Sequence, residues 1–409
     1  MRPRGESRSV NHTVATRETN AMIAAAYDRV PCDPAVADDA LDPDRVLGLG
    51  AVYGAAGTRR GDVLDLGCGS GIQLARAAQQ MQGRLVGVDL SAESCKMARI
   101  KLAPLGTRAD IVHADFLDLA PETLGQFDFI YNIGVIFVVP PEVRNRIIQL
   151  IGKCLKPGGV AVLGYYAGSL DTLRGNLHRT LRSVVQEETD IAAAIALARA
   201  HLQMMKRTLP TSGPERAMLL AAIQQTEALP DAPFFHEALN QCFDAIQTTQ
   251  IERMLAEHGT GFASYLGPSP FVELAGSRER AIAADAMDFS YSSYRYAAFV
   301  RWADARQSPD LRRDNIIWHS ALKADSSAPQ NGQAMVFRMP DGQSITVRGA
   351  VTIALLNILQ DKPLTWHEAF SAARQSVAPS QALSNQEQVS LASFAALWRY
   401  NYVAPRICW

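Results

Sequence analysis

The chain has 409 residues, too many for one ordinary hydrophobic core and suited to about two domains or one domain with large insertions. Its 40 Lys and Arg residues nearly balance its 41 Asp and Glu residues, so no overall charge favours nucleic acid or an acidic membrane. The six cysteines form neither a CxxC pair nor a Cys/His cluster at zinc spacing, so we expect reduced thiols and no metal.

The N-terminal segment is basic and polar and lacks the apolar core of a signal peptide. Because no run of 18 apolar residues follows, we also expect no membrane-spanning helix. These observations predict a cytoplasmic enzyme that makes no membrane contact. We expect residues 1–60 to form an N-terminal helical lid.

Strand and helix patterns alternate between residues 61 and 169. Short apolar runs predict strands at 62–66, 84–90, 109–116, 127–133 and 158–166. Apolar residues three and four apart predict helices at 71–81, 91–103 and 141–155. This alternation indicates an α/β fold with a doubly wound, Rossmann-like parallel sheet.

Helical spacing continues from 170 to 258, after which strand patterns return at 261–267 and 295–303. We therefore predict a helical cap at 170–258, inserted before the strands in 259–322 that complete the sheet. A polar linker at 323–333 precedes a hairpin signal at Asp341-Gly342. Residues 334–409 are expected to form a separable C-terminal domain.

A glycine loop follows the first strand, where Gly67, Gly69 and Gly71 let the backbone approach a ligand. In a dinucleotide site this loop would hold a pyrophosphate at the helix N-terminus. Here Asp65 stands two residues before the loop, where a carboxylate repels phosphate and suits a cationic amino acid.

Two further acids end the second and third strands. Asp89 is placed to accept hydrogen bonds from ribose hydroxyls, Asp115 can accept from an adenine amino group, and Phe116 can pack on the adenine face. Acids at three consecutive strand ends predict a site for a nucleoside joined to an ammonium group. The alternative is a glycine turn with solvated acids on a sheet that binds nothing.

The ordered motifs "DLGCGSG" (65–71), "GVDLS" (87–91), "HADF" (113–116) and "FDFIYN" (127–132) resemble those of class I S-adenosylmethionine-dependent methyltransferases. The resemblance implies S-adenosyl-L-methionine as the cofactor. It implies that the cofactor-binding residues are Asp65, Gly67, Gly69, Gly71, Asp89, Leu90, Asp115, Phe116 and Asn132.

A wider resemblance covers nearly the whole chain. The segments "YDRVP" (27–31), "PFFHEALNQCFD" (233–244), "ERMLAEHGTGFASYLG" (252–267) and "DFSYSSYRYAAFVR" (288–301) are similar to bacterial methyltransferases with a so-called regulatory domain. That group includes rickettsial protein-lysine methyltransferases, so it implies methylation of an amine such as a protein lysine. The tail resembles their small winged-helix-like domain, which offers a contact for a partner or a second subunit.

The acceptor side departs from the family pattern at "IGVIFVVP" (133–140), which is almost wholly apolar. We expect Ile133, Ile136, Phe137 and His236 to line the substrate pocket, and Tyr27, Asn132, Tyr165 and Tyr166 to be catalytic. A dry pocket would favour a neutral amine acceptor. Alternatively, residues 136–139 simply pack beneath the inserted helices.

Two other functions stay open at this point. The apolar acceptor side also suits a biosynthetic methyltransferase that modifies N, O or S of a small molecule. A non-catalytic regulator that binds S-adenosylmethionine is the third possibility.

Overall fold

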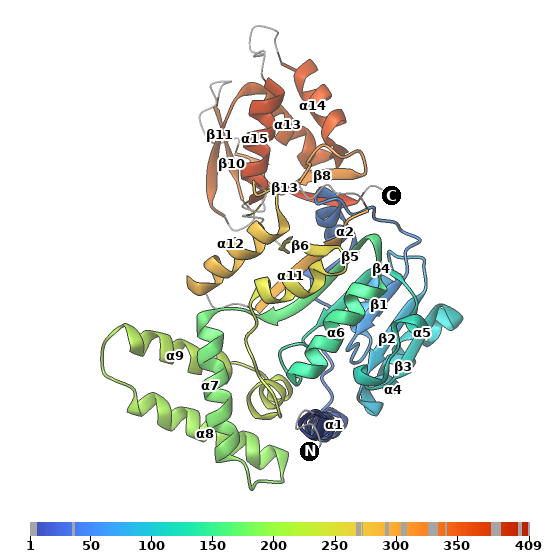
Figure 1. Ribbon diagram of the computed structural model, residues 1–409. Helices are drawn as coiled ribbons and strands as arrows, with labels where there is room; N and C mark the ends of the chain where they lie inside the picture. Colours follow the sequence, from blue (N-terminus) through green and yellow to red (C-terminus); the bar gives the residue numbers. More distant parts are fainter. Residues whose placement is uncertain are drawn as a thin grey trace.

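The computed structural model describes residues 6–34, 37–266, 271, 273–290, 294–303, 309–325, 334–339, 342–377, 386–399 and 403–407. Its centre is a seven-stranded sheet of order β3-β2-β1-β4-β5-β7-β6 (Figure 1). The first five strands are parallel, and β7 runs antiparallel to both β5 and β6. This arrangement confirms the predicted Rossmann-like sheet, including the return of the chain to it after a long insertion.

The strands of this sheet are β1 (Val63–Leu66), β2 (Leu85–Asp89), β3 (Ala109–His113), β4 (Phe127–Ile133), β5 (Leu155–Tyr166), β6 (Thr260–Tyr265) and β7 (Tyr294–Arg301). The helices around it are α1 (Glu6–Arg29), α2 (Pro43–Val52), α3 (Ile72–Ala77), α4 (Ala92–Leu102), α5 (Pro121–Leu124), α6 (Pro141–Cys154), α11 (Thr248–Ala256) and α12 (Ser277–Ser290). Short helical turns lie at η1 (Asp39–Leu41), η2 (Ala103–Arg108) and η3 (Phe116–Asp118).

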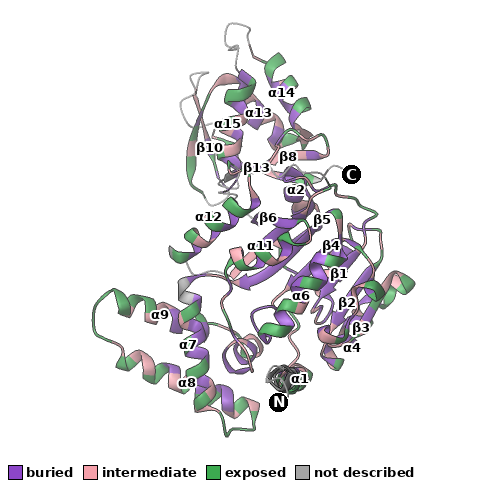
Figure 2. Ribbon diagram, in the orientation of Figure 1, coloured by how far each residue is buried: buried purple, intermediate pink, exposed green. Residues whose placement is uncertain are grey.

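Helices cover both faces of the sheet. All four residues of β1 are buried, as expected for a parallel strand that is packed on both sides. Val63 and Leu64 point to opposite faces and belong to different hydrophobic clusters. On one of those faces, α6 buries Val143, Ile147 and Ile151, which follow one another at four-residue spacing along the helix. Figure 2 shows this buried centre as purple strands.

The insertion between β5 and β6 is mostly helical, as predicted. It contains α7 (Ser169–Val184), α8 (Ile191–Thr208), α9 (Pro214–Glu227), α10 (Asp231–Phe234) and η4 (Phe235–Leu239), followed by α11. The helices α7, α8 and α9 project from the sheet (Figure 1) and have their own hydrophobic cluster. That cluster includes Ala26 of α1, so the insertion packs against the N-terminal helix.

The C-terminal part contains β8 (Ile316–Ser320), β9 (Lys323–Ala324), β10 (Ala334–Arg338), β11 (Ser344–Arg348), α13 (Ala350–Asp361), β12 (Leu364–Thr365), α14 (Trp366–Gln375), α15 (Gln386–Arg399) and β13 (Val403–Ile407). The strands form two small sheets of orders β11-β10-β9 and β12-β8-β13. The predicted hairpin is present as antiparallel β10 and β11. Its predicted turn residue Asp341 lies outside the described residues.

The predicted boundary of this domain is wrong. β8 lies between β12 and β13, so the domain takes its central strand from residues that we assigned to the larger sheet. The alternating burial of β8 explains this pairing, because Trp318 needs apolar partners that α15 and β13 supply. Of the predicted linker, 323–324 form β9 and 326–333 lie outside the described residues.

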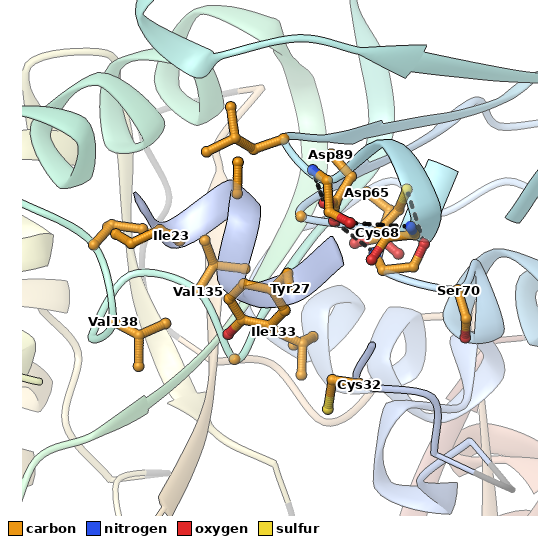
Figure 3. Close-up of a pocket in the computed structure, with 18 of the residues that line it drawn as sticks. Ile23, Tyr27, Cys32, Asp65, Cys68, Ser70, Asp89, Ile133, Val135 and Val138 are labelled. Atoms are coloured by element: carbon orange, nitrogen blue, oxygen red, sulfur yellow. Dashed lines mark hydrogen bonds between the residues drawn. The ribbon is translucent and has the colours of Figure 1, made fainter. Parts of the chain in front are cut away.

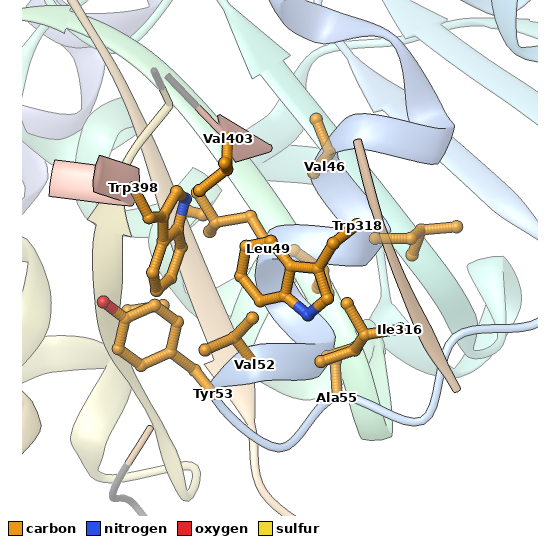
Figure 4. Packing of buried hydrophobic residues seen from close by; sticks show 14 of the residues in the cluster. Val46, Leu49, Val52, Tyr53, Ala55, Ile316, Trp318, Trp398 and Val403 are labelled. Carbon is orange, nitrogen blue, oxygen red and sulfur yellow. The ribbon is translucent and has the colours of Figure 1, made fainter. Parts of the chain in front are cut away.

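The prediction that residues 43–55 belong to the N-terminal lid is wrong. These residues join the sheet to the C-terminal part. Val46, Leu49 and Val52 of α2 pack near Trp318 and Trp398 (Figure 4). The contact is close because α2 has a glycine facing β13. A β-carbon on Gly48 would lie only 2.5 Å from the Arg406 α-carbon.

None of the helices in the described ranges combines the length and apolar character needed to cross a membrane.

Candidate active site

A cavity of about 290 Å³ lies at the carboxyl ends of the first four strands, beneath α1 (Figure 3). Figure 3 shows the acids Asp65 and Asp89 on one side and the apolar side chains Ile23 and Val138 on the other. The predicted residues that line this cavity are Tyr27, Asp65, Gly67, Gly69, Asp89, Leu90, Asp115, Phe116 and Ile133. Residues far apart in the sequence therefore meet because parallel strands end at one edge.

The glycine loop leaves β1 with backbone angles that favour glycine. Gly67 and Gly69 have φ values of +86° and +50°. A β-carbon on Gly67 would lie 2.3 Å from Val135 Cγ2, so this glycine lets the loop approach the segment after β4. A β-carbon on Gly69 would meet only the Cys32 carbonyl oxygen at 3.8 Å, so Gly69 keeps its part of the cavity open.

Asp89 is held in place by the loop that it faces. Its Oδ2 accepts a hydrogen bond from the Gly69 backbone N–H at 2.8 Å, and its Oδ1 accepts from the Ser91 N–H at 2.9 Å. Burial raises the pKa of Asp89, although these backbone donors oppose the shift. Each oxygen keeps a second lone pair for a ligand hydroxyl.

Of the three acids, Asp65 has the least support from neighbouring groups for its negative charge. Its side chain is 2% exposed, and burial followed by repulsion from Asp89 raises its pKa to about 8. No described residue donates a hydrogen bond that lowers this pKa. The cavity therefore presents a carboxyl group whose ionised form lacks a cationic partner within the described protein.

The third acid, Asp115, is covered by α1. Asn20 Nδ2 donates to Asp115 Oδ2 at 2.8 Å, and the Leu117 backbone N–H donates to Oδ1 at 2.9 Å. Arg17 binds Asp118 through both of its terminal nitrogens, at 3.2 and 2.7 Å. The N-terminal helix is thus fixed next to the end of β3.

At its other end, α1 is fixed to α4 and to the insertion. Asp28 accepts hydrogen bonds from the Ser91 hydroxyl at 2.7 Å and from the Glu93 backbone N–H at 3.1 Å. Tyr27 points into the cavity from the next position and stacks on His236, with ring centroids 3.7 Å apart and planes 4° apart. Within the region predicted as a lid, α1 is therefore held against the core at both ends.

His236, which we predicted for the substrate pocket, lies behind Tyr27 and does not line this cavity. Its Nε2 donates to the Val30 carbonyl oxygen at 2.6 Å, since a carbonyl only accepts. His236 Nδ1 is buried and has no hydrogen-bond partner in the described protein. Burial lowers the pKa of His236, so the neutral ring supports Tyr27 by stacking.

Tyr166 belongs to an aromatic group next to this pair, outside the lining of the cavity. Its hydroxyl donates to Glu237 Oε2 at 2.9 Å, and Arg174 donates to the same oxygen at 2.8 Å. The Arg174 guanidinium also lies 4.2 Å from the centroid of the Tyr166 ring. The ring of Phe137 packs edge-on against Tyr166 at 5.0 Å.

The apolar segment after β4 divides its residues between the cavity and the core. Gly134, at a φ of +79°, turns the chain, and Val135 and Val138 face the cavity together with Ile133. Ile136 and Phe137 are buried in the hydrophobic cluster beneath the insertion and do not line this cavity, so their assignment to the substrate pocket stays a prediction. Their burial supports the packing alternative for these two side chains.

Three other predicted residues also lie outside the cavity lining. Tyr165 is fully buried and shares a hydrogen bond of 2.8 Å with the Thr248 hydroxyl. Asn132 is equally buried and donates to the Leu66 carbonyl oxygen at 2.7 Å, so it ties β4 to β1. Gly71 caps the N-terminus of α3, where a β-carbon would lie 3.1 Å from the Ala98 β-carbon, so its role is close helix packing.

Sequence reasoning missed much of the lining. The unpredicted residues are Asn20, Ile23, Ala24, Cys32, Pro34, Cys68, Ser70, Ile72, Gln73, Ser91, Ser94, Gly134, Val135, Val138, Val139 and Val143. The spacing of Asn20, Ile23 and Tyr27 on one helical face was a signal that was available in the sequence. Within the described ranges, no group of three or more His, Cys, Asp or Glu side chains is arranged to hold a metal ion.

Comparison with known proteins identifies residues 63–159 as similar to a family described as "Methyltransferase domain". The chain is 29% identical to the Rickettsia prowazekii protein RP028 over 165 residues, covering 39% of this chain and 63% of that protein. It is 32% identical to the ubiquinone biosynthesis O-methyltransferase of Bordetella avium over 120 residues, covering 29% and 48%. The matches therefore span less than two thirds of these relatives.

The fold of nearly the whole chain has a solved counterpart. PKMT2 from Rickettsia typhi superimposes with a TM-score of 0.71 at 17% identity, covering 91% of this chain and 77% of PKMT2. The complex of PKMT2 with AdoHcy gives the same TM-score and covers 92% of this chain. The chain thus has the class I methyltransferase fold, extended by the same kind of additional elements.

Proposed function

We propose that this protein, whose residues 63–159 form a class I methyltransferase domain, transfers a methyl group from S-adenosylmethionine to an amine such as a protein lysine. The observation that carries the proposal is the cavity in which Asp65, Asp89 and Asp115 meet beside an open glycine loop. The three acids are complementary to a nucleoside joined to an ammonium group, and their negative charge would repel a phosphate from the loop.

Each part of the cofactor would have its own partner among the residues that line the cavity. Asp65 would pair with the ammonium group and thereby lose the electrostatic cost that now raises its pKa to about 8. Asp89 would accept from ribose hydroxyls, while Asp115 and Phe116 would bind the adenine ring. When bound, S-adenosylmethionine would supply an electrophilic methyl group on a sulfonium. The acceptor nitrogen would donate its lone pair to the methyl carbon while the carbon–sulfur bond breaks, and the electron pair of that bond would stay on the sulfur of the departing S-adenosylhomocysteine.

The protein supplies orientation and a dry surface for this reaction. Ile133, Val135 and Val138 present apolar surface to the cavity, which penalises a charged acceptor and favours the neutral amine. Tyr27 offers a hydroxyl whose pKa is raised by burial, so it stays protonated and can orient the acceptor by a hydrogen bond. We infer that stacking on His236 holds the Tyr27 ring in this position.

Support for a lysine acceptor comes from the fold shared with PKMT2 and from the segments that resemble rickettsial protein-lysine methyltransferases.

We place the protein in the cytoplasm, where thiols stay reduced, because its five described cysteines are free. The helical insertion would then border the acceptor side through η4 and α7, and the C-terminal part would be a contact for a partner or a second subunit.

A small-molecule acceptor is the second candidate, and one feature of the site favours it. Arg174 already pairs with Glu237 at 2.8 Å and covers the ring of Tyr166. An internal cation therefore occupies the acid and aromatic surface that would otherwise attract a lysine ammonium. The similarity to ubiquinone biosynthesis O-methyltransferases points the same way.

The two candidates are distinguished by incubating the purified protein with S-adenosylmethionine carrying a tritiated methyl group. Lysine-containing peptides and a bacterial lysate serve as protein acceptors, and the small-molecule fraction of the same lysate serves as the alternative. We expect label in protein lysines by mass spectrometry, and loss of labelling in Tyr27→Ala. Label only in small molecules would support the second candidate, and no transfer to any acceptor would contradict both.

A further inference from the structure

Asn20 of α1 is a buried amide that faces the candidate cofactor cavity. Its side chain is 2% exposed, and its Nδ2 donates to Asp115 Oδ2 at 2.8 Å. A carboxylate oxygen can only accept, so the amide nitrogen must face Asp115 and the carbonyl Oδ1 must face elsewhere. No described residue donates a hydrogen bond to that Oδ1. A second acceptor is thus held beside Asp115 and is available to a ligand.

We propose that Asn20 and Asp115 together read the 6-amino group of the adenine ring, so that the site rejects purines with an oxygen at position 6. This inference rests on the proposed binding of S-adenosylmethionine and adds the residue that selects its base. An amino group has two hydrogens, and the two side chains provide two acceptors for them: Asn20 Oδ1 and a remaining lone pair of Asp115.

A 6-oxo purine would place an acceptor against these acceptors. The purine oxygen would find no donor, and both protein oxygens would lose their hydrogen bonds to the ligand in a buried site. Sites that are built to bond an N–H reject analogues without it far more strongly than apolar sites reject a missing methyl group. The pair would therefore select against a 6-oxo purine because that base leaves polar groups in the site without hydrogen-bond partners.

Asn20 also sits on the helix that covers the cavity, so its effect on the base must be separated from its effect on the helix. The neighbouring Arg17–Asp118 ion pair fixes the same helix but does not line the cavity. Both of its side chains are about half exposed, at 49% and 57%. Arg17→Ala therefore loosens α1 without removing a base contact and is the matched control for Asn20→Ala.

The test is calorimetric titration of the full chain with S-adenosylhomocysteine and with its 6-oxo analogue, S-inosylhomocysteine. We expect the wild type to bind the adenine ligand at least about a hundredfold more tightly. Asn20→Ala should reduce this ratio by about tenfold or more, since one discriminating hydrogen bond is lost. Arg17→Ala should weaken both ligands by the same factor and leave the ratio unchanged.

Each other outcome overturns the inference in a recognisable way. Equal weakening of both ligands by Asn20→Ala would make Asn20 a helix contact only. Equal binding of both ligands by the wild type would show that the base is not read, while the proposed cofactor site would stand. Failure of the wild type to bind either ligand would contradict the cofactor proposal itself.

Discussion

The carboxyl group of Asp65 is buried beside Asp89, and its pKa of about 8 sets a pH dependence for ligand binding. The folded state without ligand holds this proton more tightly than the unfolded chain does. The stability that the proton contributes is therefore complete below the ordinary pKa of about 4 and is lost as the pH rises to about 8. Binding of an ammonium group requires the opposite, ionised form.

We predict that S-adenosylhomocysteine binds more tightly as the pH rises from 6 to 8, because Asp65 must release its proton. The gain should approach about tenfold per pH unit near pH 6 and should flatten near pH 8. Titration calorimetry in buffers of different ionisation enthalpy measures both the affinity and the proton release. Asp65→Asn should bind weakly with little pH dependence. A wild-type affinity that stays constant over this range, without proton release, would contradict this role for Asp65.

Asp89 gives a second prediction for a single residue. Asp89→Ala should weaken binding of S-adenosylhomocysteine by about 1.5 to 3 kcal/mol, because the ribose-directed carboxylate is lost. Asp62 is a matched control, since its Oδ1 also accepts a backbone hydrogen bond, from Arg84 at 2.9 Å, but it lies outside the cavity lining. Asp62→Ala should leave the affinity unchanged, and wild-type affinity in Asp89→Ala would refute the assignment.

Among the structural elements, the segment between β4 and α6 contains both side chains that line the cavity and side chains that pack in the core. Its side chains divide into Val138, which lines the cavity, and Phe137, whose ring packs against Tyr166, Phe243 and Tyr294. The same apolar run therefore contains one position suited to excluding water from the acceptor and one that stabilises the fold.

We predict that Phe137→Asn lowers methyl transfer to an amine by a similar factor at every pH and lowers the melting temperature, because it removes about 3 kcal/mol of packing. Val138→Asn should instead reduce activity most near neutral pH, with partial recovery at higher pH, since water at the acceptor stabilises the ammonium form. Profiles of rate against pH and thermal unfolding measure both effects. A loss in Phe137→Asn that recovers at high pH would return this residue to the acceptor site.

For the whole molecule, the decisive feature is the core that α2 shares with the C-terminal part. Figure 4 shows residues from three distant regions of the chain in it, among them Leu49, Trp318 and Trp398. This contact contradicts the simple picture of a tail joined by a linker, because β8 and α2 both lie N-terminal to the predicted linker.

We predict that the protein unfolds in one cooperative transition and that Trp318→Ala destabilises the whole chain by about 3 to 5 kcal/mol. Scanning calorimetry with and without S-adenosylhomocysteine is the measurement, and the ligand should shift the entire transition. Two separate transitions, of which only one responds to the ligand and the other to Trp318→Ala, would restore the separable domain. Phe289→Ala is a suitable control, since this side chain is 78% exposed.

The sheet and the polar half of the site could be predicted from local patterns in the sequence. Alternating strand and helix patterns are local, and acids that follow successive strands must meet when those strands are parallel. Asp65, Asp89 and Asp115 could therefore be predicted together without knowledge of any distant contact.

Three features could not be predicted in this way: which side chains of residues 133–139 face the cavity, the contact of Asn20 with Asp115, and the place of β8 in the C-terminal sheet. An apolar run without period has no preferred face, and a helix such as α1 can cover several surfaces with the same residues. These choices depend on contacts between segments far apart in the chain, such as Asn20 with Asp115 and Trp318 with Trp398, which no local pattern records.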